Sequence, residues 1–399
     1  MYINSFNDLI IMNTYHCVRL FIIKLVRVCL CTIHLAPIRK NKVVFMSFGG
    51  EQISCNPLYI YRKLKEEYPS SFNIYWVLNP GKIKDDSEKR IIKYGSWQFL
   101  YHMLTASCVL TNDTLPTYLP FRKSQLVINT WHGGGLFKQT YGNSTKSEKE
   151  YNRSVNNIHN DDTSLYTSSG KAWSEQVVKK RFGYSGEILP CGMARNDIFF
   201  SDVSAVVRKV KSDFNIPETD AIVLYAPTFR GNAINASLGV LESNPINVEA
   251  LLSKLNDKYN RKFHFIFRGH HTLSAVMIGC LNASDYPDMQ ELLASADVFL
   301  SDYSSCLWDY TFTYRPCFIY APDFDTYAVK PGFESDFKYW PFPIARSNNV
   351  LLSHIEHFDI EKYKRNVDLY HVEYGSYESG KATSEICKYM CDKLNVKLL

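Results

Sequence analysis

The segment NTWHGGGLFK, residues 129–138, combines a histidine, three glycines and a lysine directly after an apolar run. Glycines let backbone N–H groups approach a ligand closely, and a helix that starts there favours an anion. His132 would then lie beside a phosphate or a hydroxyl group. Further candidate contacts are Gly133, Gly134 and Lys138. The alternative is a structural histidine beside a flexible turn, but the complete pattern after a strand favours a functional role.

A threonine and an arginine follow a second apolar run, in YAPTFRG at 225–231. A hydroxyl and a guanidinium that leave the carboxyl end of a strand suit a phosphate group. Thr228 and Arg230 are therefore predicted to contact phosphate. The alternative is a turn that carries a surface arginine.

The segment IFRGHH at 266–271 repeats this arrangement with Arg268 and two adjacent histidines. Neighbouring side chains of an extended segment point to opposite sides, so at most one of the two histidines faces a given ligand. The pattern alone does not choose between His270 and His271. The other histidine is expected to be packed or on the surface.

A fourth polar group, in DVFLSDYSSCLWDY at 297–310, lies between a predicted strand and a predicted helix. Serine hydroxyls and backbone N–H groups at a helix start can bind an anion without a cation. Ser304 and Ser305 are thus predicted phosphate contacts, and Asp302 is a further candidate. As plain helix-capping residues they would look the same.

Taken together, these segments predict a diphosphate site. The sequence contains neither G-x-x-x-x-G-K-[ST] nor a G-x-G-x-x-G after its first strand, which argues against a P-loop ATPase and against a dinucleotide cofactor. Asp323-Phe324-Asp325 resembles a metal-binding DxD, but it follows Pro322 in an expected loop and supplies only two carboxylates. We therefore expect no metal and no other cofactor, and a nucleotide-diphosphate donor.

Short β-branched and aromatic runs alternate with helical patterns from Lys42 onward, which is typical of parallel sheets built from βαβ units. The first series of strands is predicted at 43–47, 73–78, 107–111 and 126–129, and the second at 221–226, 264–267, 297–301 and 317–320. Helices are predicted at 57–68, 247–259, 288–295 and 306–314. The fold class is therefore α/β, with two Rossmann-like domains facing a central cleft. Ligands of such sheets bind outside the carboxyl ends of the strands, where the four polar segments lie.

The predicted domains cover residues 42–205, for the acceptor, and 206–399, for the nucleotide donor. Residues 1–41 form a separate basic segment. The polar stretch at 139–162 is interpreted as a mobile loop beside the cleft, because it shows no helical or strand periodicity.

All of the net charge of +5 lies in residues 1–42, which hold six cations and one acidic residue, Asp8; the remainder holds 39 basic and 39 acidic residues. A neutral body argues against nucleic-acid binding. Arg19, Lys24 and Arg27 interrupt the apolar stretch at 9–35, so a membrane span would be costly. We predict an imperfect amphipathic helix on an anionic membrane surface; the alternative is a helix packed on the protein itself.

The eleven cysteines are scattered and form no C-x-x-C pair, which favours reduced thiols in a cytosolic chain and argues against structural zinc. With 46% hydrophobic and 21% charged residues, the chain should fold into globular domains.

The sequence resembles the CDP-glycerol glycerophosphotransferase family of teichoic acid and capsule synthesis. The resemblance covers nearly all of the chain beyond the N-terminal helix. It is carried by SFGGEQISCNPLYIYRKL (47–64), TWHGGGLFK (130–138), GMARND (192–197), YAPTFRG (225–231), FRGHH (267–271), SDYSSCLWDY (301–310), RPCFIYAPDFDTY (315–327) and SGKATSEI (379–386). The family commonly has Thr-Pro where this chain has Gly134 and Gly135, and Pro where it has His271.

The resemblance implies a GT-B type architecture, a donor on the second domain and an acceptor entering from the first. It implies that His132 is the catalytic base and that His270 is the second catalytic histidine. It also implies that the donor phosphates contact the residues Arg230, Arg268, Ser304 and Ser305.

The expected reaction is transfer of glycerol phosphate from CDP-glycerol, or a similar CDP-alditol, to a hydroxyl of a lipid-linked or polymer acceptor, with release of CMP. The enzyme would work as a peripheral protein on the cytoplasmic face of the cell membrane. Two alternatives remain open: a GT-B glycosyltransferase that uses a nucleotide sugar, and a non-catalytic, membrane-bound polymer-binding protein. The sequence does not choose between glycerol and ribitol.

Overall fold

A computed structural model describes residues 6–83, 89–137, 146–228, 244–269, 280–329 and 332–396. The chain forms two compact units. Unit 1 comprises Met1–His132, Asn143–Arg195 and Tyr377–Leu399, and unit 2 comprises Gly133–Gly142 and Asn196–Ser376. The chain therefore crosses between the units four times, directly after His132, Gly142, Arg195 and Ser376.

Unit 1 is built on a seven-stranded sheet in the order β3-β2-β1-β4-β5-β6-β7, in which all neighbouring strands are parallel. Its strands are β1 (Arg39–Met46), β2 (Asn73–Leu78), β3 (Arg90–Lys93), β4 (Ala106–Thr111), β5 (Leu126–Asn129), β6 (Leu165–Thr167) and β7 (Glu187–Leu189). The central strands are rich in Val, Ile and aromatic residues because both faces of a parallel sheet are buried.

Helices cover both faces of this sheet. One core contains Phe45 and Trp76 of the sheet together with Leu64 of α2 (Cys55–Glu67) and Met390 of α13 (Ala382–Leu394). The alternate residues of β1, such as Val44, point to the other core, which includes α3 (Trp97–Thr105). The remaining helices are α1 (Phe6–Leu30), α4 (Lys146–Asp162) and a π-helix at Trp173–Arg181, with short 3-10 turns at Cys31–Leu35, Phe48–Gly50 and Pro80–Lys82.

Unit 2 contains a six-stranded parallel sheet in the order β10-β9-β8-β11-β12-β13. The strands are β8 (Ala221–Tyr225), β9 (Phe263–Phe267), β10 (Leu281–Asn282), β11 (Val298–Ser301), β12 (Cys317–Tyr320) and β13 (Ile344–Ala345). The helices are α5 (Ser204–Asp213), α7 (Val248–Tyr259), α8 (Met289–Ser295), α9 (Cys306–Thr311), α10 (Phe324–Val329), α11 (Asn348–Glu356) and α12 (Ile360–Tyr374), with 3-10 turns at Ala194–Phe200 and Phe337–Tyr339.

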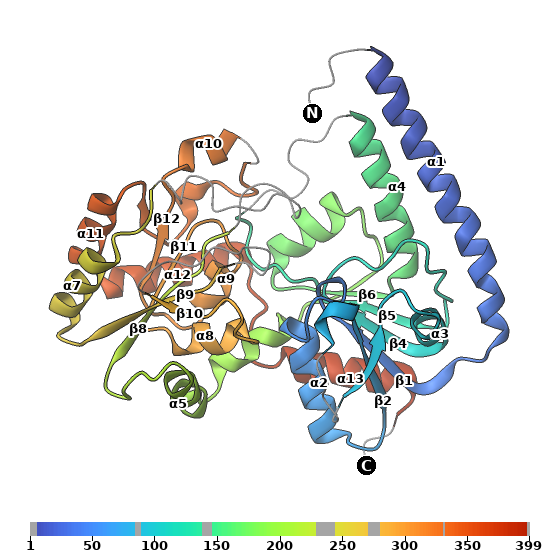
Figure 1. Cartoon of the computed structure of the whole chain (residues 1–399), viewed down its shortest axis with the longest axis horizontal. Coiled ribbons are helices and arrows are strands. Elements are labelled where there is room, and N and C mark those ends of the chain that lie inside the picture. The colour runs from blue at the N-terminus through green and yellow to red at the C-terminus, as the bar shows by residue number, and fades with distance from the viewer. Residues whose placement is uncertain are drawn as a thin grey trace. The chain divides into compact units, whose positions relative to one another are not determined.

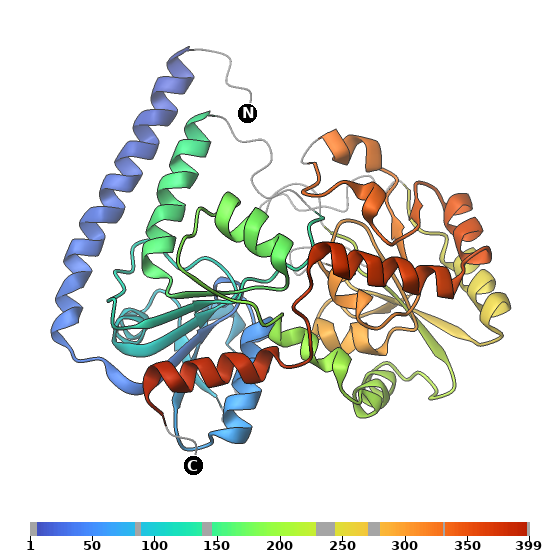
Figure 2. The same cartoon turned by 180° about the vertical axis from the view of Figure 1, so that it is seen from behind.

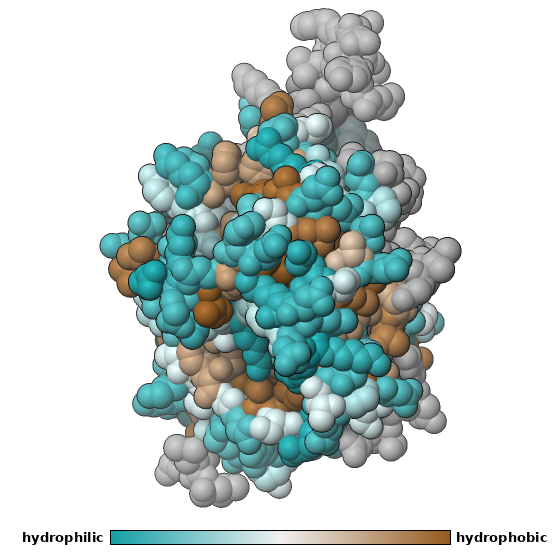
Figure 3. Space-filling model, turned by 90° about the vertical axis from the view of Figure 1, so that its left-hand side faces the viewer, coloured by the Kyte–Doolittle hydropathy of each residue, from teal (hydrophilic) through white to brown (hydrophobic). Residues whose placement is uncertain are grey.

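The helices α7 and α11 pack on one face of this sheet through leucine and isoleucine side chains, among them Leu251, Leu255, Leu351 and Ile355. The outer surface of the molecule on this side is largely hydrophilic (Figure 3). Figure 1 shows both units with most of their elements labelled.

The predicted α/β class with two parallel-sheet units is confirmed, and all eight predicted strands are present with ends shifted by at most a few residues. The observed units differ from the predicted domains at the last helix, because the prediction assigned all of residues 206–399 to one domain. Residues 377–399 belong to unit 1, where α13 lies beside α2 (Figure 2). The reason is the apolar face of α13, on which Ile386 and Met390 are fully buried against the unit 1 core.

The prediction of a loop at 139–162 is wrong for residues 146–162, which form the helix α4; residues 138–145 lie outside the described part. Tyr151, Val155, Ile158 and His159 are spaced by three or four residues or adjoin one another and lie on one face of the helix, while the other positions are polar. This sparse stripe suffices because α4 lies beside α1 (Figures 1 and 2). His16 of α1 stacks on Tyr151.

The predicted N-terminal helix is present as α1, but its basic face is not directed to the solvent as a whole. Arg27 points inward and forms a bidentate ion pair with Asp162 of α4, with both N···O distances 2.8 Å. Its Nη1 also donates to the carbonyls of Thr117 and Leu119. The predicted basic face is therefore partly used inside unit 1. Among the described residues, no helix combines the length and the apolar character that a membrane crossing requires.

We predict that Met390→Ala destabilises unit 1 by about 2–5 kcal/mol, because it leaves a cavity in a fully buried core. Lys388→Ala, on the exposed side of the same helix, should change stability by less than about 0.5 kcal/mol. Hydrogen exchange after denaturant titration would localise the effect. Faster exchange confined to the strands of unit 2 would contradict the placement of α13.

Candidate functional site

His132 is the last residue of unit 1 before the chain crosses to unit 2, and it follows β5 by three residues. Its imidazole is held by a hydrogen bond of 2.6 Å between Nδ1 and the backbone carbonyl of Asn112, which directly follows the neighbouring strand β4. The rings of Trp131 and Phe48 lie against it, with centroids 4.8 and 5.1 Å away. The ring is thus fixed on three sides.

The partner of Nδ1 determines the tautomer of His132. A carbonyl oxygen only accepts hydrogen bonds, so Nδ1 carries the proton and the lone pair is on Nε2. Burial lowers the pKa of His132 from its ordinary value of 6.5, and the charge of Arg195 lowers it further. Asp113 and the hydrogen bond to Asn112 act in the opposite direction. A neutral imidazole with its lone pair on Nε2 is the form that a general base requires.

The backbone around His132 is strained. Trp131, Phe48 and Cys55 have φ values of 50°, 46° and 60°, in the left-handed region that bulky residues rarely adopt. Such residues cost about 1–3 kcal/mol each and cluster at functional sites, where the surrounding contacts maintain them. The amide N–H of Phe48 donates to Asn112 Oδ1 at 2.8 Å, so Asn112 positions both Phe48 and the imidazole.

The residues that hold this geometry were given no role by the sequence analysis. Asn56 and Arg195 occur in its quoted motifs, but only the fold brings them beside Trp131 and His132. Asn112 could have been found, because it directly follows β4, at the carboxyl edge where ligand-binding residues of parallel sheets gather.

In unit 2, Thr228 and Asp302 follow the adjacent strands β8 and β11 and bind each other. The Thr228 hydroxyl donates to Asp302 Oδ2 and its amide to Oδ1, both at 2.9 Å. Asp302 is fully buried and also accepts from the amide of Tyr303 at 2.6 Å. This pair therefore joins the two loops at the carboxyl edge of the sheet.

Arg268 follows β9, the strand on the other side of β8. Its Nη1 donates to the carbonyl of Tyr286 at 2.7 Å, which anchors the side chain in the turn after β10. Burial lowers the pKa of Arg268, and the charge of Cys306 acts in the opposite direction. Arg268 and the predicted serine segment thus follow β9 and β11, the two strands that flank β8.

Ser304 and Ser305 immediately precede α9. Within residues 298–312 the chain is buried except at Ser304, Ser305 and Cys306, so these are the accessible positions of the segment. Ser304 Oγ accepts from the amide of Cys306 at 3.3 Å, whereas Ser305 makes no capping bond with its side chain. Ser304 therefore acts as a helix cap, as the alternative interpretation allowed.

The glycines after His132 serve packing in the structure. A Cβ atom at Gly134 would overlap the Trp308 side chain of α9. Gly135 has a φ of +70°, and a Cβ atom there would overlap the ring of Phe137. Gly133 is half-buried. Lys138, Arg230, His270 and His271 lie outside the described residues, so their predicted roles stay predictions.

The two carboxylates of the DxD are used separately. Asp323 accepts a hydrogen bond of 3.1 Å from the Tyr303 hydroxyl, and Asp325 pairs with Arg346 at 3.0 Å. The expected loop is in fact the start of α10 at Phe324. In the part of the chain that the structure describes, no three His, Cys, Asp or Glu side chains gather as a metal site would need.

Two α/β units with parallel sheets agree with the GT-B type of fold; unit 1 carries a half-buried histidine, and unit 2 carries arginine and serine side chains at its strand ends. Residues 29–392 match the family described as CDP-glycerol:poly(glycerophosphate) glycerophosphotransferase, and the chain belongs to this family.

Similar proteins include a teichoic acid poly(glycerol phosphate) polymerase of Bacillus subtilis, 27% identical over 365 residues that cover 88% of this chain and 48% of that protein. This chain therefore spans about half of that relative. A teichoic acid ribitol-phosphate primase of Bacillus spizizenii is 27% identical over 381 residues, covering 89% and 92%. A solved structure of the wall teichoic acid polymerase TagF, 23% identical, has the same fold, with a TM-score of 0.78 over 97% of this chain and 98% of that chain.

We predict that His132 is neutral at neutral pH with its proton on Nδ1, and that its pKa lies below 6.5. A long-range proton–nitrogen spectrum of histidine-labelled protein reports both properties, and His132→Gln assigns the signal. An Nε2–H tautomer, or a pKa above 6.5, would show that the Asn112 contact does not define this ring.

Proposed function

We propose that this protein transfers glycerol phosphate from CDP-glycerol, or a similar CDP-alditol, to a hydroxyl of a membrane-associated acceptor in the synthesis of a teichoic acid-like or capsular polymer. The proposal combines membership of the family with one observation. His132, in the Trp-His-Gly segment that carries the family resemblance, has Nδ1 bound to a carbonyl and its lone pair on Nε2.

In the proposed reaction, Nε2 of His132 takes the proton of the acceptor hydroxyl. The oxygen forms a bond to the β-phosphorus of CDP-glycerol, while the bond from this phosphorus to the bridging oxygen breaks and CMP leaves with that oxygen. Phosphoryl transfer of this kind depends mainly on positioning and on stabilising charge on the phosphate oxygens.

We assign charge stabilisation to the unit 2 residues Arg268, Ser304 and Ser305, and to Arg230 and His270 outside the described part. The positions of Arg268 and of the two serines, after the two strands that flank β8, support a common phosphate site for these three residues. Thr228 is now assigned a shaping role, because its hydroxyl proton is used by Asp302.

The choice between glycerol and ribitol, and between one addition and many, is not made by any described contact. A glycosyltransferase that uses a nucleotide sugar would leave no phosphate in its product, and a non-catalytic polymer-binding protein would release no CMP. Incubation with CDP-glycerol, CDP-ribitol and a UDP-hexose, followed by nucleotide and phosphate analysis, therefore separates the three functions.

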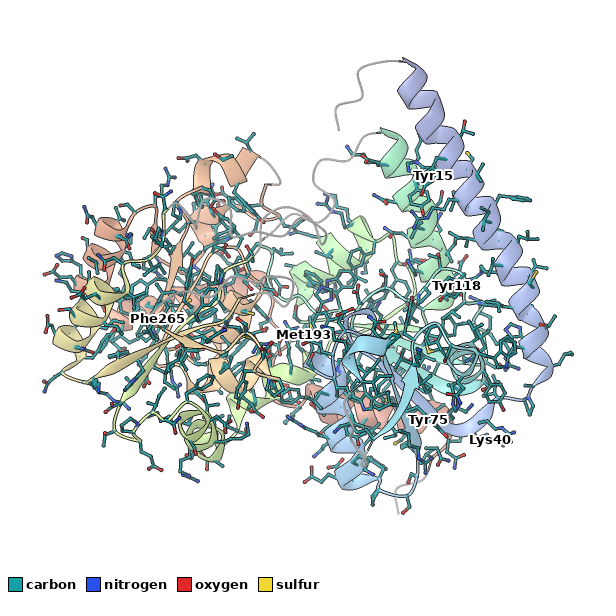
Figure 4. The ribbon with its side chains drawn as sticks, in the orientation of Figure 1. Tyr15, Lys40, Tyr75, Tyr118, Met193 and Phe265 are labelled. Atoms are coloured by element: carbon teal, nitrogen blue, oxygen red, sulfur yellow. The ribbon has the colours of Figure 1, made fainter. Side chains whose placement is uncertain are left out.

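We further propose that the protein works as a peripheral protein on the cytoplasmic face of the cell membrane, held there by α1. Large apolar side chains of α1 face outward, among them Phe21, Leu25 and Val28, which are 67%, 54% and 69% exposed. Figure 4 labels Tyr15, another exposed residue of this helix. Since Arg27 is bound to Asp162, the apolar contribution to membrane binding should exceed the electrostatic one that the charge count suggested.

We predict that His132→Gln lowers CMP release from CDP-glycerol by at least about 10²-fold, the usual contribution of a general base, with little change in donor binding. His357→Gln, which changes an exposed histidine of unit 2, is the matched control. Because the pKa of His132 is lowered, the base stays unprotonated at neutral pH, and activity should fall only as the pH drops below 6.5. Turnover above a tenth of the wild-type value in His132→Gln would rule out the base.

For the membrane proposal, we compare Leu25→Ser/Val28→Ser in α1 with Leu369→Ser/Val372→Ser in α12. Both pairs have the same residue types and spacing, and the α12 side chains are 61% and 78% exposed. The α1 variant should bind anionic vesicles at least about tenfold more weakly, because burying Leu or Val contributes about 1.5–3 kcal/mol. The α12 variant should bind like wild type, and high salt should release only part of either protein. Equal losses in the two variants would refute the role of α1.

A further inference from the structure

Arg195 is buried next to the candidate base, with only 4% of its surface exposed. Its Nη1 donates a hydrogen bond of 2.6 Å to the backbone carbonyl of His132. The same nitrogen lies 3.1 Å from Sγ of Cys55, one of the strained residues of the site. A buried guanidinium is costly unless its donors are used, so its place beside His132 calls for a physical explanation.

Arg195 and Asn56 together hold two consecutive peptide groups. Asn56 Nδ2 donates to the carbonyl of Trp131 at 2.9 Å, and Arg195 holds the carbonyl of His132. The two are also joined to each other, because the amide of Arg195 donates to Asn56 Oδ1 at 3.0 Å. These bonds oppose the relaxation of Trp131 from its left-handed conformation, which would turn the imidazole of His132.

Arg195 is itself held by the segment that returns to unit 1. The amide of Met193, which is labelled in Figure 4, donates to Glu378 Oε2 at 3.0 Å, and the Thr383 hydroxyl donates to the carbonyl of Ala194 at 3.2 Å. A Cβ atom at Gly192, where φ is +91°, would meet Glu378. The backbone that presents Arg195 is therefore itself fixed by Glu378 and Thr383.

We propose that Arg195 is a positioning residue for the reaction: with Asn56, it fixes the peptide groups on either side of His132 and so aims Nε2 of the imidazole at the acceptor hydroxyl. This inference rests on the proposed function, because that function identifies His132 as the base. The hydrogen bond between Arg195 and the His132 carbonyl does not depend on it. Its charge has a second effect, since it lowers the pKa of His132 while Asp113 raises it.

The test uses the full-length protein and separates geometry from charge. Arg195→Met removes the hydrogen bond to the His132 carbonyl and also the positive charge, whereas Arg195→Lys keeps the charge. Asn56→Ala removes the hydrogen bond to the Trp131 carbonyl but leaves the arginine in place. The control is Arg122→Met. Arg122 is a half-buried arginine of unit 1, whose guanidinium donates to the carbonyls of His34, Ala36 and Leu104.

We expect Arg195→Met to lower kcat for CMP release about 10²-fold, the cost of a misplaced reacting group, with KM for CDP-glycerol nearly unchanged. The pKa of His132, measured by the histidine spectrum, should rise in Arg195→Met and less in Arg195→Lys. Arg195→Lys should recover part of kcat. Asn56→Ala should lower kcat without raising this pKa, and Arg122→Met should change neither quantity.

The proposal is overturned if two results are found together for Arg195→Met: the pKa of His132 equals that of the wild type, and kcat equals that of the control Arg122→Met. If Arg195→Met does not fold, an unchanged kcat in both Arg195→Lys and Asn56→Ala overturns it equally. A wild-type protein that releases no CMP from any CDP-alditol would refute the proposed function instead. The spectrum of His132 in the variants would then still test the contact with Arg195.

Discussion

Parallel pairing of every neighbouring strand is the constraint on which the rest of this structure depends. It places the carboxyl ends of all strands of a sheet at one edge, so polar residues that are far apart in the sequence become neighbours. In unit 1 this edge joins Asn112, after β4, to His132, after β5. In unit 2 it joins Thr228, after β8, to Asp302, after β11, with Arg268 on the other flank of β8.

The environment of His132 shows how a strained backbone is maintained. Trp131 lies in the left-handed region, yet its amide, its carbonyl and the following carbonyl are all hydrogen-bonded to buried side chains, Asn129, Asn56 and Arg195 respectively. Leaving such groups unpaired in the interior would cost about 1–3 kcal/mol each, so the network and the strain are mutually dependent. The result is an imidazole whose direction is set by the protein alone.

The helix α1 shows the opposite of the usual arrangement on a globular protein. Arg27 faces the body of unit 1, and bulky apolar side chains face outward. An ion pair with two good hydrogen bonds to a largely buried carboxylate gives the helix a defined rotation about its axis. Exposed apolar surface on a helix of fixed orientation is the physical basis of the proposed membrane contact.

The sequence by itself determined the α/β class, the positions of the longer strands and the polar segments at their carboxyl ends, because these follow from local hydrophobic patterns and residue types. The tertiary structure decided the rest. The sparse stripe of Tyr151, Val155, Ile158 and His159 forms a helix because α1 lies beside it. The C-terminal helix belongs to unit 1 because Met390 is buried there. Likewise, Arg195 is 63 residues from His132 in the chain, so only the fold could reveal their hydrogen bond. Contacts between distant residues depend on packing geometry, which no local pattern of residue types contains.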